Sequence, residues 1–300
     1  MPVYLRPTSL KAALSALAEE AASTGASDQT LTVLAGGTDI YPARAGRQAW
    51  LRPFPRDFLD ITAISELRGI REEGRAWLIG ATTSWSELVA KPLPEAFDAL
   101  KQAALEIGGR QIQNRGTVGG NIVNASPAAD GVPPLMSLDA TVDIASVRGQ
   151  RSMPLATFIR GNRRTALAKD ELVVAIRVPP HRPTARSVFL KLGARSHLVI
   201  SIASIALLLD IRPDRVIDDI RLTVGACSAV PTRLAALEAE LRGNPLSAQL
   251  LERVTAALTG PLSPIDDIRA SSAYRLEAAR ILVRRALARF VTEDPDRVAA

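Results

Sequence analysis

The chain has 300 residues, of which 47% are hydrophobic and only 4% aromatic. This length is typical of two domains rather than of one small core. The formal net charge is +6, but only five of the 37 basic residues are lysines and the arginines are scattered, so we expect no nucleic-acid-binding surface.

Residues that hold metals or form disulfides are scarce in this sequence. The single cysteine, Cys227, excludes an intramolecular disulfide and an iron–sulfur cluster built only from thiolates of this chain, so we expect a small core residue. The two histidines, His181 and His197, stand in no metal-binding pattern. No leader segment is evident, and the best apolar run, residues 198–209, is too short to span a membrane. We therefore expect a soluble, cytoplasmic protein.

The first part of the chain mixes helical and strand patterns. Residues 9–22 are rich in Ala, Leu and Glu at helical spacing and predict the first helix. Ser84, with Glu87 three residues later, is typical of a helix start, and residues 97–107 predict an amphipathic helix. Short strands are predicted at 31–34, 59–61, 77–80, 141–145 and 171–178, with a turn or short helix at 64–70 and a hairpin turn at 148–151.

The pattern of predicted strands and helices changes after a double proline, Pro179 and Pro180, which is the best candidate for a linker between domains. Beyond it, strands are predicted at 188–192, 199–210 and 216–225, and helices at 231–241, 247–258 and 271–291. Strands followed by helices favour an α+β domain over repeated β-α-β units. We therefore expect two domains, residues 1–180 and 184–292, and a tail at 293–300.

A glycine-rich stretch follows the predicted strand at 31–34. Gly36 and Gly37 allow a tight turn that exposes several backbone N–H groups, and Thr38 adds a hydroxyl. Such a turn binds anions, most simply a phosphate. The stretch lacks the Gly-Lys-Ser/Thr of a Walker A loop and the third glycine of a Rossmann fingerprint. Taken alone, it has an ordinary turn as its alternative interpretation.

A second glycine-rich stretch lies at residues 115–127. Gly119 and Gly120 predict a second anion-binding turn. Short polar residues surround them or follow closely: Thr117, Asn121, Asn124, Ser126 and Asp130. Two such turns match a pyrophosphate bridge and argue for an extended dinucleotide between them. Two unrelated loops are the alternative.

The order of these motifs resembles the FAD-binding subunit of the molybdenum hydroxylases, the family of the medium subunit of carbon monoxide dehydrogenase and the flavin domain of xanthine dehydrogenase. The resemblance covers nearly the whole chain, through residues 33–40, 67–70, 80–83, 117–130, 228–233 and 272–275. It implies an α+β fold with a two-subdomain FAD-binding domain of the vanillyl-alcohol-oxidase type. A smaller α+β domain with a three-stranded antiparallel sheet and helices would follow.

The resemblance also implies which residues bind FAD, without a covalent link. Residues 33–40 would surround the pyrophosphate, and Thr117 would hydrogen-bond the cofactor. Asn121 and Asp130 would lie near the adenosine or pyrophosphate portion. Ile107 takes the place of an aromatic residue found in xanthine dehydrogenases, and for Lys191 an exposed strand lysine is the alternative. The predicted cofactor-binding residues are Val33, Leu34, Ala35, Gly36, Gly37, Thr38, Asp39, Ile40, Ile107, Thr117, Gly119, Gly120, Asn121, Asn124, Ser126, Asp130, Val173 and Lys191.

The same resemblance implies an electron-transfer subunit with no catalytic residues and no metal site of its own. Hydroxylation would take place at a molybdenum cofactor in a large partner subunit. The [2Fe-2S] clusters of a small partner subunit would pass electrons to FAD, and from there they would reach NAD+, a quinone-type acceptor or O2. The assembly would be a dimer of heterotrimers.

Two other interpretations stay open. One is a self-sufficient flavin oxidase or reductase of the same fold, which needs acid–base residues in its second domain. The other is a cofactor-free interaction protein that keeps the fold. An absorption spectrum of the purified protein separates the cofactor-free protein from the two flavoproteins.

Overall fold

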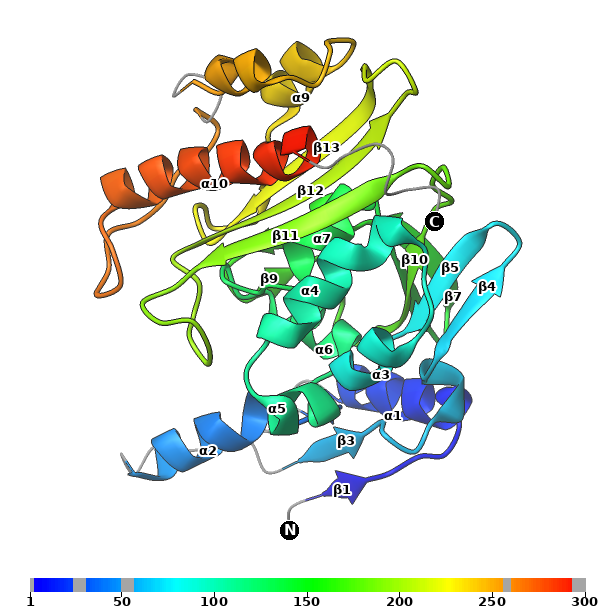
Figure 1. The fold of residues 1–300 in the computed structure, drawn as a ribbon. Coiled ribbons are helices and arrows are strands. Elements are labelled where there is room, and N and C mark those ends of the chain that lie inside the picture. The colour runs from blue at the N-terminus through cyan, green and yellow to red at the C-terminus, as the bar shows by residue number, and fades with distance from the viewer. Residues whose placement is uncertain (1–2, 24–30, 50–56, 256–259, 293–300) are drawn as a thin grey trace. The chain divides into compact units, whose positions relative to one another are not determined.

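The computed structural model describes residues 3–23, 31–49, 57–255 and 260–292, and the chain folds into two compact units, whose elements Figure 1 shows. Unit 1 comprises Met1–Lys91, Arg110–Ala125 and Ala140–Pro179, and unit 2 comprises Pro92–Gly109, Ser126–Asp139 and Pro180–Ala300. The last change of unit falls at the double proline. The domain division at 1–180 and 184–292 stays a prediction, since unit 2 also takes in two earlier segments.

The described residues of unit 1 form a three-stranded parallel sheet and a five-stranded antiparallel sheet. In the parallel sheet, β1 (Tyr4–Leu5) and β2 (Thr32–Leu34) flank β3 (Phe58–Asp60). The antiparallel sheet has the order β4 (Ile70–Glu73), β5 (Ala76–Gly80), β10 (Leu172–Val178), β6 (Thr141–Ser146) and β7 (Gly149–Pro154). A separate hairpin consists of β8 (Ile159–Gly161) and β9 (Arg164–Thr165).

Two helices of unit 1 begin at serine caps, of which the sequence analysis predicts the one at Ser84. Ser9 Oγ accepts the Ala12 amide at the start of α1 (Leu10–Ala22). Ser84 and Glu87 form the predicted capping box at α3 (Trp85–Ala90). The other helical segments are a 3₁₀ turn at Ser65–Leu67, α2 (Ile40–Ala49), α5 (Arg110–Arg115), α6 (Val118–Asn124) and α8 (Leu155–Phe158). The buried face of α1 packs in one cluster with Leu59, Ile61 and Leu172.

The hairpin between β6 and β7 turns earlier than predicted. Ser146 pairs with Gly149, so the loop consists of Val147 and Arg148 and the predicted turn at 148–151 is wrong. The Ser146 hydroxyl accepts the Arg148 amide at 3.2 Å, and Gly149 supplies a φ of 133°. Gly149 is therefore the first residue of β7 rather than the centre of the turn.

Unit 2 is built on an antiparallel sheet with the order β11 (Arg186–Leu192), β12 (Ala203–Ile211), β13 (Ile217–Gly225) and β14 (Thr232–Arg233). The three long strands confirm the predicted three-stranded antiparallel sheet, to which β14 adds a two-residue edge. β12 begins at Ala203 rather than at the predicted residue 199. The reason is local, since Leu198 has a φ of 52° and Ser201 bonds outside the sheet.

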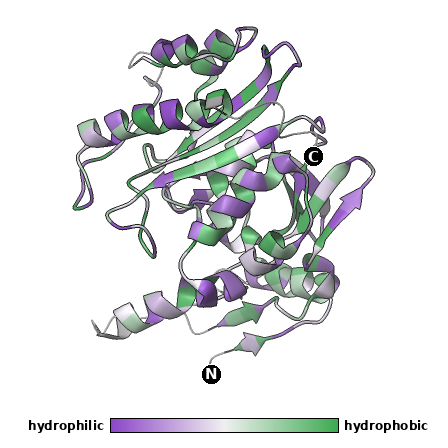
Figure 2. Ribbon diagram, viewed as in Figure 1, coloured by the Kyte–Doolittle hydropathy of each residue, from purple (hydrophilic) through white to green (hydrophobic). Residues whose placement is uncertain are grey.

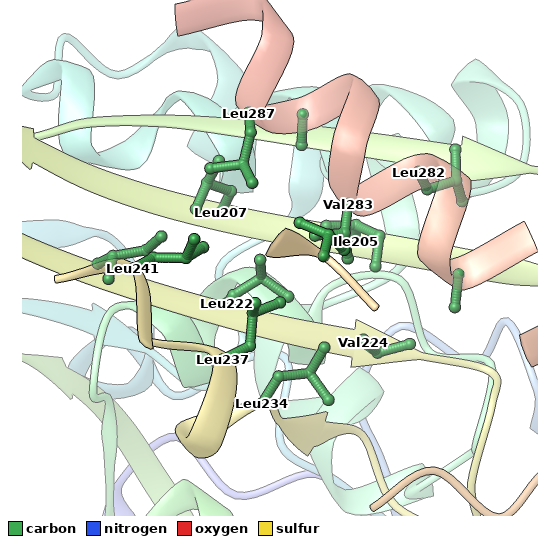
Figure 3. Close-up of a cluster of buried hydrophobic side chains, with 14 of the residues drawn as sticks. Ile205, Leu207, Leu222, Val224, Leu234, Leu237, Leu241, Leu282, Val283 and Leu287 are labelled. Atoms are coloured by element: carbon green, nitrogen blue, oxygen red, sulfur yellow. The ribbon is translucent and has the colours of Figure 1, made fainter. Parts of the chain in front are cut away.

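Helices cover both faces of this sheet, which explains why β12 is an almost continuous apolar run. Ile205 and Leu207 share a buried cluster with side chains of α9 (Ala235–Leu241) and α10 (Ser272–Thr292), as Figure 3 shows. Ala206 points to the opposite face, toward α4 (Asp98–Glu106) and α7 (Val132–Ser137). Along α10, green hydrophobic and purple hydrophilic segments alternate in Figure 2, as is typical of a helix with one buried face.

The helix predictions for unit 2 are confirmed in part. The helices α4, which follows a 3₁₀ turn at Glu95–Phe97, and α10 agree with the predictions. The predicted helix at 247–258 contains a 3₁₀ helix, Ala248–Arg253, instead of an α-helix. Its predicted end at 256–258 lies outside the described residues. α7 was not predicted because two prolines occupy its first turn, where a missing N–H is harmless. The α+β fold class is confirmed. No helix in the part of the chain that the structure describes is long and apolar enough to cross a membrane.

Candidate functional site

The first glycine-rich stretch leads from the carboxyl end of β2 into α2. Leu34 still belongs to the sheet edge, since its carbonyl accepts the Ile61 amide at 3.0 Å. The chain turns at Gly37, which has a φ of 72°, and the Tyr41 amide donates to the Gly37 carbonyl at 3.0 Å. The amides of residues 36–40 have no acceptor among the described residues. They stand at the positive end of α2, a place that favours an anion.

The two glycines of this stretch are required by space as well as by conformation. A Cβ atom on Gly36 would lie 2.0 Å from the carbonyl oxygen of Arg115, and one on Gly37 would lie 2.4 Å from the Tyr41 ring. Gly36 therefore lets the turn approach the backbone of the second stretch. Gly46, later in α2, has nothing within 4 Å of its Cβ position and serves as a comparison.

The second stretch is a helix, and the predicted anion-binding turn at Gly119 and Gly120 is wrong. Thr117 is the N-cap of α6, and its Oγ1 accepts the Gly120 amide at 3.1 Å. The Gly119 amide donates to the Ala81 carbonyl at 2.9 Å. A Cβ atom on Gly119 would lie 2.7 Å from that same carbonyl oxygen. These glycines therefore allow α6 to pack closely, and their amides are already bonded.

Unit 1 joins the two stretches through side chains as well as backbone. The Asn124 side-chain amide donates to Asp39 Oδ1 at 3.2 Å, and Arg163 Nη1 donates to Asn124 Oδ1 at 2.8 Å. Asn121 Oδ1 is buried and has no hydrogen-bond partner among the described residues. Because buried oxygens are almost always paired, this atom marks a position for a donor from a ligand.

A small cavity of about 90 Å³ lies between the two stretches, at the carboxyl ends of β2 and β3. Ligands commonly bind at this end of parallel strands. Thr62 lies in the turn after β3, and its hydroxyl donates to Asp60 Oδ1 at 2.6 Å. Burial favours the neutral acid, but hydrogen bonds from Thr62 and Tyr4 hold the pKa of Asp60 below its ordinary value. The lining residues are Ala35, Gly36, Thr62, Arg68, Thr82, Ser84, Glu87, Asn114, Arg115 and Thr117.

Asp130 and Lys191 form a buried ion pair within unit 2. Lys191 Nζ lies 2.7 Å from Asp130 Oδ2, and the two side chains are only 7% and 8% exposed. Ser201 Oγ donates to Asp130 Oδ1 at 2.5 Å, and Lys191 also donates to the Glu106 carbonyl at 3.3 Å. Burial raises the pKa of Asp130, and Lys191 and Ser201 oppose that rise. Lys191 is therefore not an exposed strand lysine.

Lys191 also lines a cavity of about 530 Å³ within unit 2. This volume is in the range of small-molecule sites. Three basic side chains and one acidic side chain line it, and one of the basic ones, Lys191, is paired with Asp130. The lining residues are Gln102, Glu106, Phe189, Leu190, Lys191, Leu192, Gly193, Arg195, Ser196 and Arg289.

The remaining predicted residues divide between the units. In unit 2, Ile107 is the C-cap of α4, and Ser126 Oγ accepts the Ala128 amide at 3.3 Å. In unit 1, Val173 lies in β10 with a 3% exposed side chain. The residues predicted at 33–40, 117–124 and 173 thus belong to unit 1, and Ile107, Ser126, Asp130 and Lys191 belong to unit 2.

The sequence analysis missed two residues that hydrogen-bond predicted cofactor-binding residues. Ser201 reaches Asp130 across 71 residues of sequence, and Arg163 reaches Asn124 across 39. Neither belongs to a local motif, so no pattern in the sequence connects them with their partners.

Cys227 and the candidate metal ligands were located in the structure. Cys227 is fully buried, and burial raises the pKa of its thiol to about 11, in agreement with a core role. Within residues 3–23, 31–49, 57–255 and 260–292, no group of three or more His, Cys, Asp or Glu side chains is placed to hold a metal ion.

Two family models match the chain. The model described as the FAD binding domain in molybdopterin dehydrogenase matches residues 1–181. The model described as the CO dehydrogenase flavoprotein C-terminal domain matches residues 189–290.

Known proteins are similar over most of the chain. The putative xanthine dehydrogenase FAD-binding subunit of Escherichia coli (strain K12) is 31% identical over 86% of this chain and 88% of its own length. The nicotinate dehydrogenase FAD-subunit of Eubacterium barkeri is 31% identical over 83% of this chain and 84% of its own. Among solved structures, carbon monoxide dehydrogenase from Hydrogenophaga pseudoflava matches with a TM-score of 0.85 and 29% identity, over 95% of this chain and 96% of that chain.

Proposed function

This chain belongs to the family of FAD-binding subunits of xanthine dehydrogenase and carbon monoxide dehydrogenase type, and from that premise we propose that it carries electrons from a partner subunit to an external acceptor. It is an FAD-binding oxidoreductase component, and in the proposal the FAD is bound without a covalent link. In the proposal, a small subunit with [2Fe-2S] clusters delivers the electrons from a large subunit with the molybdenum cofactor. The acceptor is NAD+, a quinone-type molecule or O2, and the assembly is a dimer of heterotrimers.

The amides of residues 36–40, for which the described part of the chain offers no acceptor, are the observation that carries this proposal. They lie at the N-terminus of α2, where a pyrophosphate is favoured by hydrogen bonds and by the helix dipole. The absence of a Cβ atom on Gly36 brings this turn against Arg115. The buried Asn121 Oδ1 offers an acceptor to the cofactor. Thr117 Oγ1 accepts an amide and keeps its own proton for donation.

Asp130 and Lys191 supply the binding groups that we assign to unit 2. The Asp130 carboxylate, held by Ser201 and Lys191, is an acceptor for a ribose hydroxyl or an amide. The Lys191 ammonium, which is paired with Asp130, borders a cavity of small-molecule size. Both assignments follow the positions that the family resemblance implies.

FAD, when bound, accepts electrons singly and releases them in pairs. The residues of this chain bind the cofactor, orient it and set the charge around it. We assign no general acid, general base or nucleophile to the chain, because hydroxylation belongs to the partner that holds molybdenum.

The test is the composition and reactivity of the complex that a tagged full-length chain recovers from its native cells. We expect two further polypeptides, FAD equimolar with this chain, and iron and molybdenum bound to the other two. After anaerobic reduction with dithionite, the flavin absorbance should recover fastest with the physiological acceptor among NAD+, a benzoquinone and O2.

Two results would contradict the proposal. A chain that purifies alone, contains FAD and turns over an organic substrate supports the self-sufficient flavoenzyme. A chain that contains no flavin in the native complex supports the interaction protein.

A further inference from the structure

The C-terminal run at residues 272–275 contains a buried arginine that the proposed function leaves unexplained. Arg275 lies in the first turn of α10 and is only 1% exposed. Its Nη2 donates to Asp267 Oδ1 at 2.7 Å. Its Nη1 donates to the carbonyls of Ile202 and Ala226, at 2.7 and 3.1 Å. The guanidinium therefore holds two loop carbonyls that lie far from it in the sequence.

The first of these carbonyls leads directly to the predicted FAD site of unit 2. Ile202 follows Ser201, whose hydroxyl is the donor to Asp130 Oδ1. Ser201 is fully buried, and Arg269 donates to its carbonyl at 3.4 Å. Because Arg275 fixes the Ile202 carbonyl, it fixes the backbone from which the Ser201 hydroxyl reaches Asp130.

The second carbonyl leads to Asp130 by a different path. Ala226 has a φ of 62°, a conformation that costs energy for a residue with a Cβ atom. Its amide donates to the Pro127 carbonyl at 3.0 Å, three residues before Asp130 in the same segment. Arg275 therefore supports both the backbone that carries Asp130 and the hydroxyl that orients its carboxylate.

The Arg275 guanidinium also leaves one buried N–H group unsatisfied within the described part of the chain, which costs stability. Arg275 Nε is buried without a hydrogen-bond partner among the described residues. An unsatisfied buried donor is destabilising, and buried ion pairs are often replaced by apolar residues without loss of stability. Stability alone therefore explains this arginine poorly.

We propose that Arg275 is a positioning residue for the Asp130–Lys191 pair and thereby for FAD. It keeps Ser201 bonded to one carboxylate oxygen of Asp130, so that the other oxygen stays with Lys191 in a fixed orientation. The inference rests on the proposed function, because it assigns Arg275 to the FAD site of unit 2.

The test uses the full-length chain stripped of flavin and titrated with FAD, with flavin fluorescence and the thermal midpoint as readouts. Arg275→Met should weaken FAD binding about tenfold, the size of a lost hydrogen bond to a charged group. Arg275→Lys, which keeps the charge and a donor, should recover part of that loss. Arg280→Met is the matched control, since Arg280 is on the same helix and bonds Glu277; it should bind FAD within about twofold of the wild type.

A double-mutant cycle with Asp130→Asn separates positioning from simple stability. If Arg275 acts through Asp130, Arg275→Met should add less than about twofold to the effect of Asp130→Asn. Ser201→Ala is a smaller change and should likewise add less than about twofold to the effect of Asp130→Asn on FAD affinity. If Arg275→Met does not fold, Ser201→Ala tests the positioning role instead.

The outcomes distinguish this inference from the proposed function. The positioning role alone is overturned if the wild-type chain binds FAD and folded Arg275→Met or Ser201→Ala binds it with the same affinity. It is also overturned if the effects of Arg275→Met and Asp130→Asn on FAD affinity multiply in the double mutant. A wild-type chain that binds no FAD overturns the proposed function and this inference with it.

Discussion

The two glycine-rich stretches of unit 1 use the same residue types for opposite purposes. In residues 36–40 the backbone amides have no acceptor among the described residues, whereas in α6 the amides of Gly119 and Gly120 are bonded to protein oxygens. A glycine pair thus marks a close approach of backbone, but only the surrounding hydrogen bonds tell whether a ligand or the protein itself approaches. We therefore propose that the first stretch is the binding element and that the second supports it.

The caps of the two helices explain this difference. α6 has Thr117 as its N-cap, and Thr117 forms an isolated bridge with Ser84, so the start of the helix is tied to neighbouring backbone. α2 follows a glycine turn that has no capping side chain for its first amides among the described residues. The amides of an uncapped helix start are satisfied by water or by a ligand, and we propose a ligand here.

The largest effect that tests this comparison is expected at Gly36. Gly36→Ala places a Cβ atom 2.0 Å from the Arg115 carbonyl oxygen, so the turn must move and several amide–phosphate bonds are lost. We expect FAD affinity to fall by more than about 100-fold, as the loss of two charge-assisted hydrogen bonds implies. Fluorescence titration of the flavin-free chain measures it.

The matched control for Gly36 is Gly46→Ala in the same helix, where the added Cβ atom meets open space. It should bind FAD within about twofold of the wild type, because alanine favours a helix without touching the turn. Equal FAD affinities in Gly36→Ala and Gly46→Ala would contradict the assignment of residues 36–40 to the FAD site.

The second effect concerns the packing role of the other stretch. Gly119→Ala should lower the free energy of unfolding of unit 1 by about 2 kcal/mol, because its Cβ atom meets the Ala81 backbone. Urea unfolding with and without FAD should show the same loss in both conditions. A loss that appears only with FAD present would show that this glycine serves the ligand after all.

A smaller effect is expected at Thr117, which caps α6 and is also a predicted FAD-binding residue. Thr117→Val removes the cap of α6 and should cost about 1 kcal/mol of stability, together with a weaker affinity for FAD. Thr117→Ser keeps the hydroxyl and should restore both quantities. Thermal unfolding and FAD titration of the pair check this, and a serine variant as impaired as the valine variant would argue against a hydroxyl role.

The smallest effect is a pH dependence of the strand beneath α6. β10 supplies the Val174 carbonyl that accepts the Ala81 amide, and Glu171 anchors the start of that strand through two bonds from Arg151. These bonds hold the pKa of Glu171 at about 2 instead of its ordinary 4.5. The stabilisation is therefore complete above pH 4.5 and is lost as the pH falls toward 2.

Because Arg151 is partly exposed to solvent, we expect the pair to contribute about 1 kcal/mol rather than the full value of the shift. Glu171→Gln should lower stability at pH 7 and flatten the loss between pH 4.5 and 2. Denaturant unfolding across this pH range measures the contribution, and equal curves for both proteins would contradict it.

The sequence predicts local features better than it predicts which groups are already bonded. The capping box at Ser84 and the strands of unit 2 need only neighbouring residues, and both are confirmed. The interpretation of Gly119 failed because its amide partner, Ala81, lies 38 residues earlier in the numbering. Ser201 was missed for the same reason. Long-range hydrogen bonds decide the site, and they leave no periodic signal in the sequence.

Hydrogen–deuterium exchange of the full-length chain, with and without FAD, tests the central claim most directly. The amides of residues 36–40, which have no acceptor among the described residues, should gain protection when FAD binds. The amides of residues 119–121, which are bonded already, should change little. Protection gained at 119–121 and absent at 36–40 would contradict the assignment of the first stretch as the binding element.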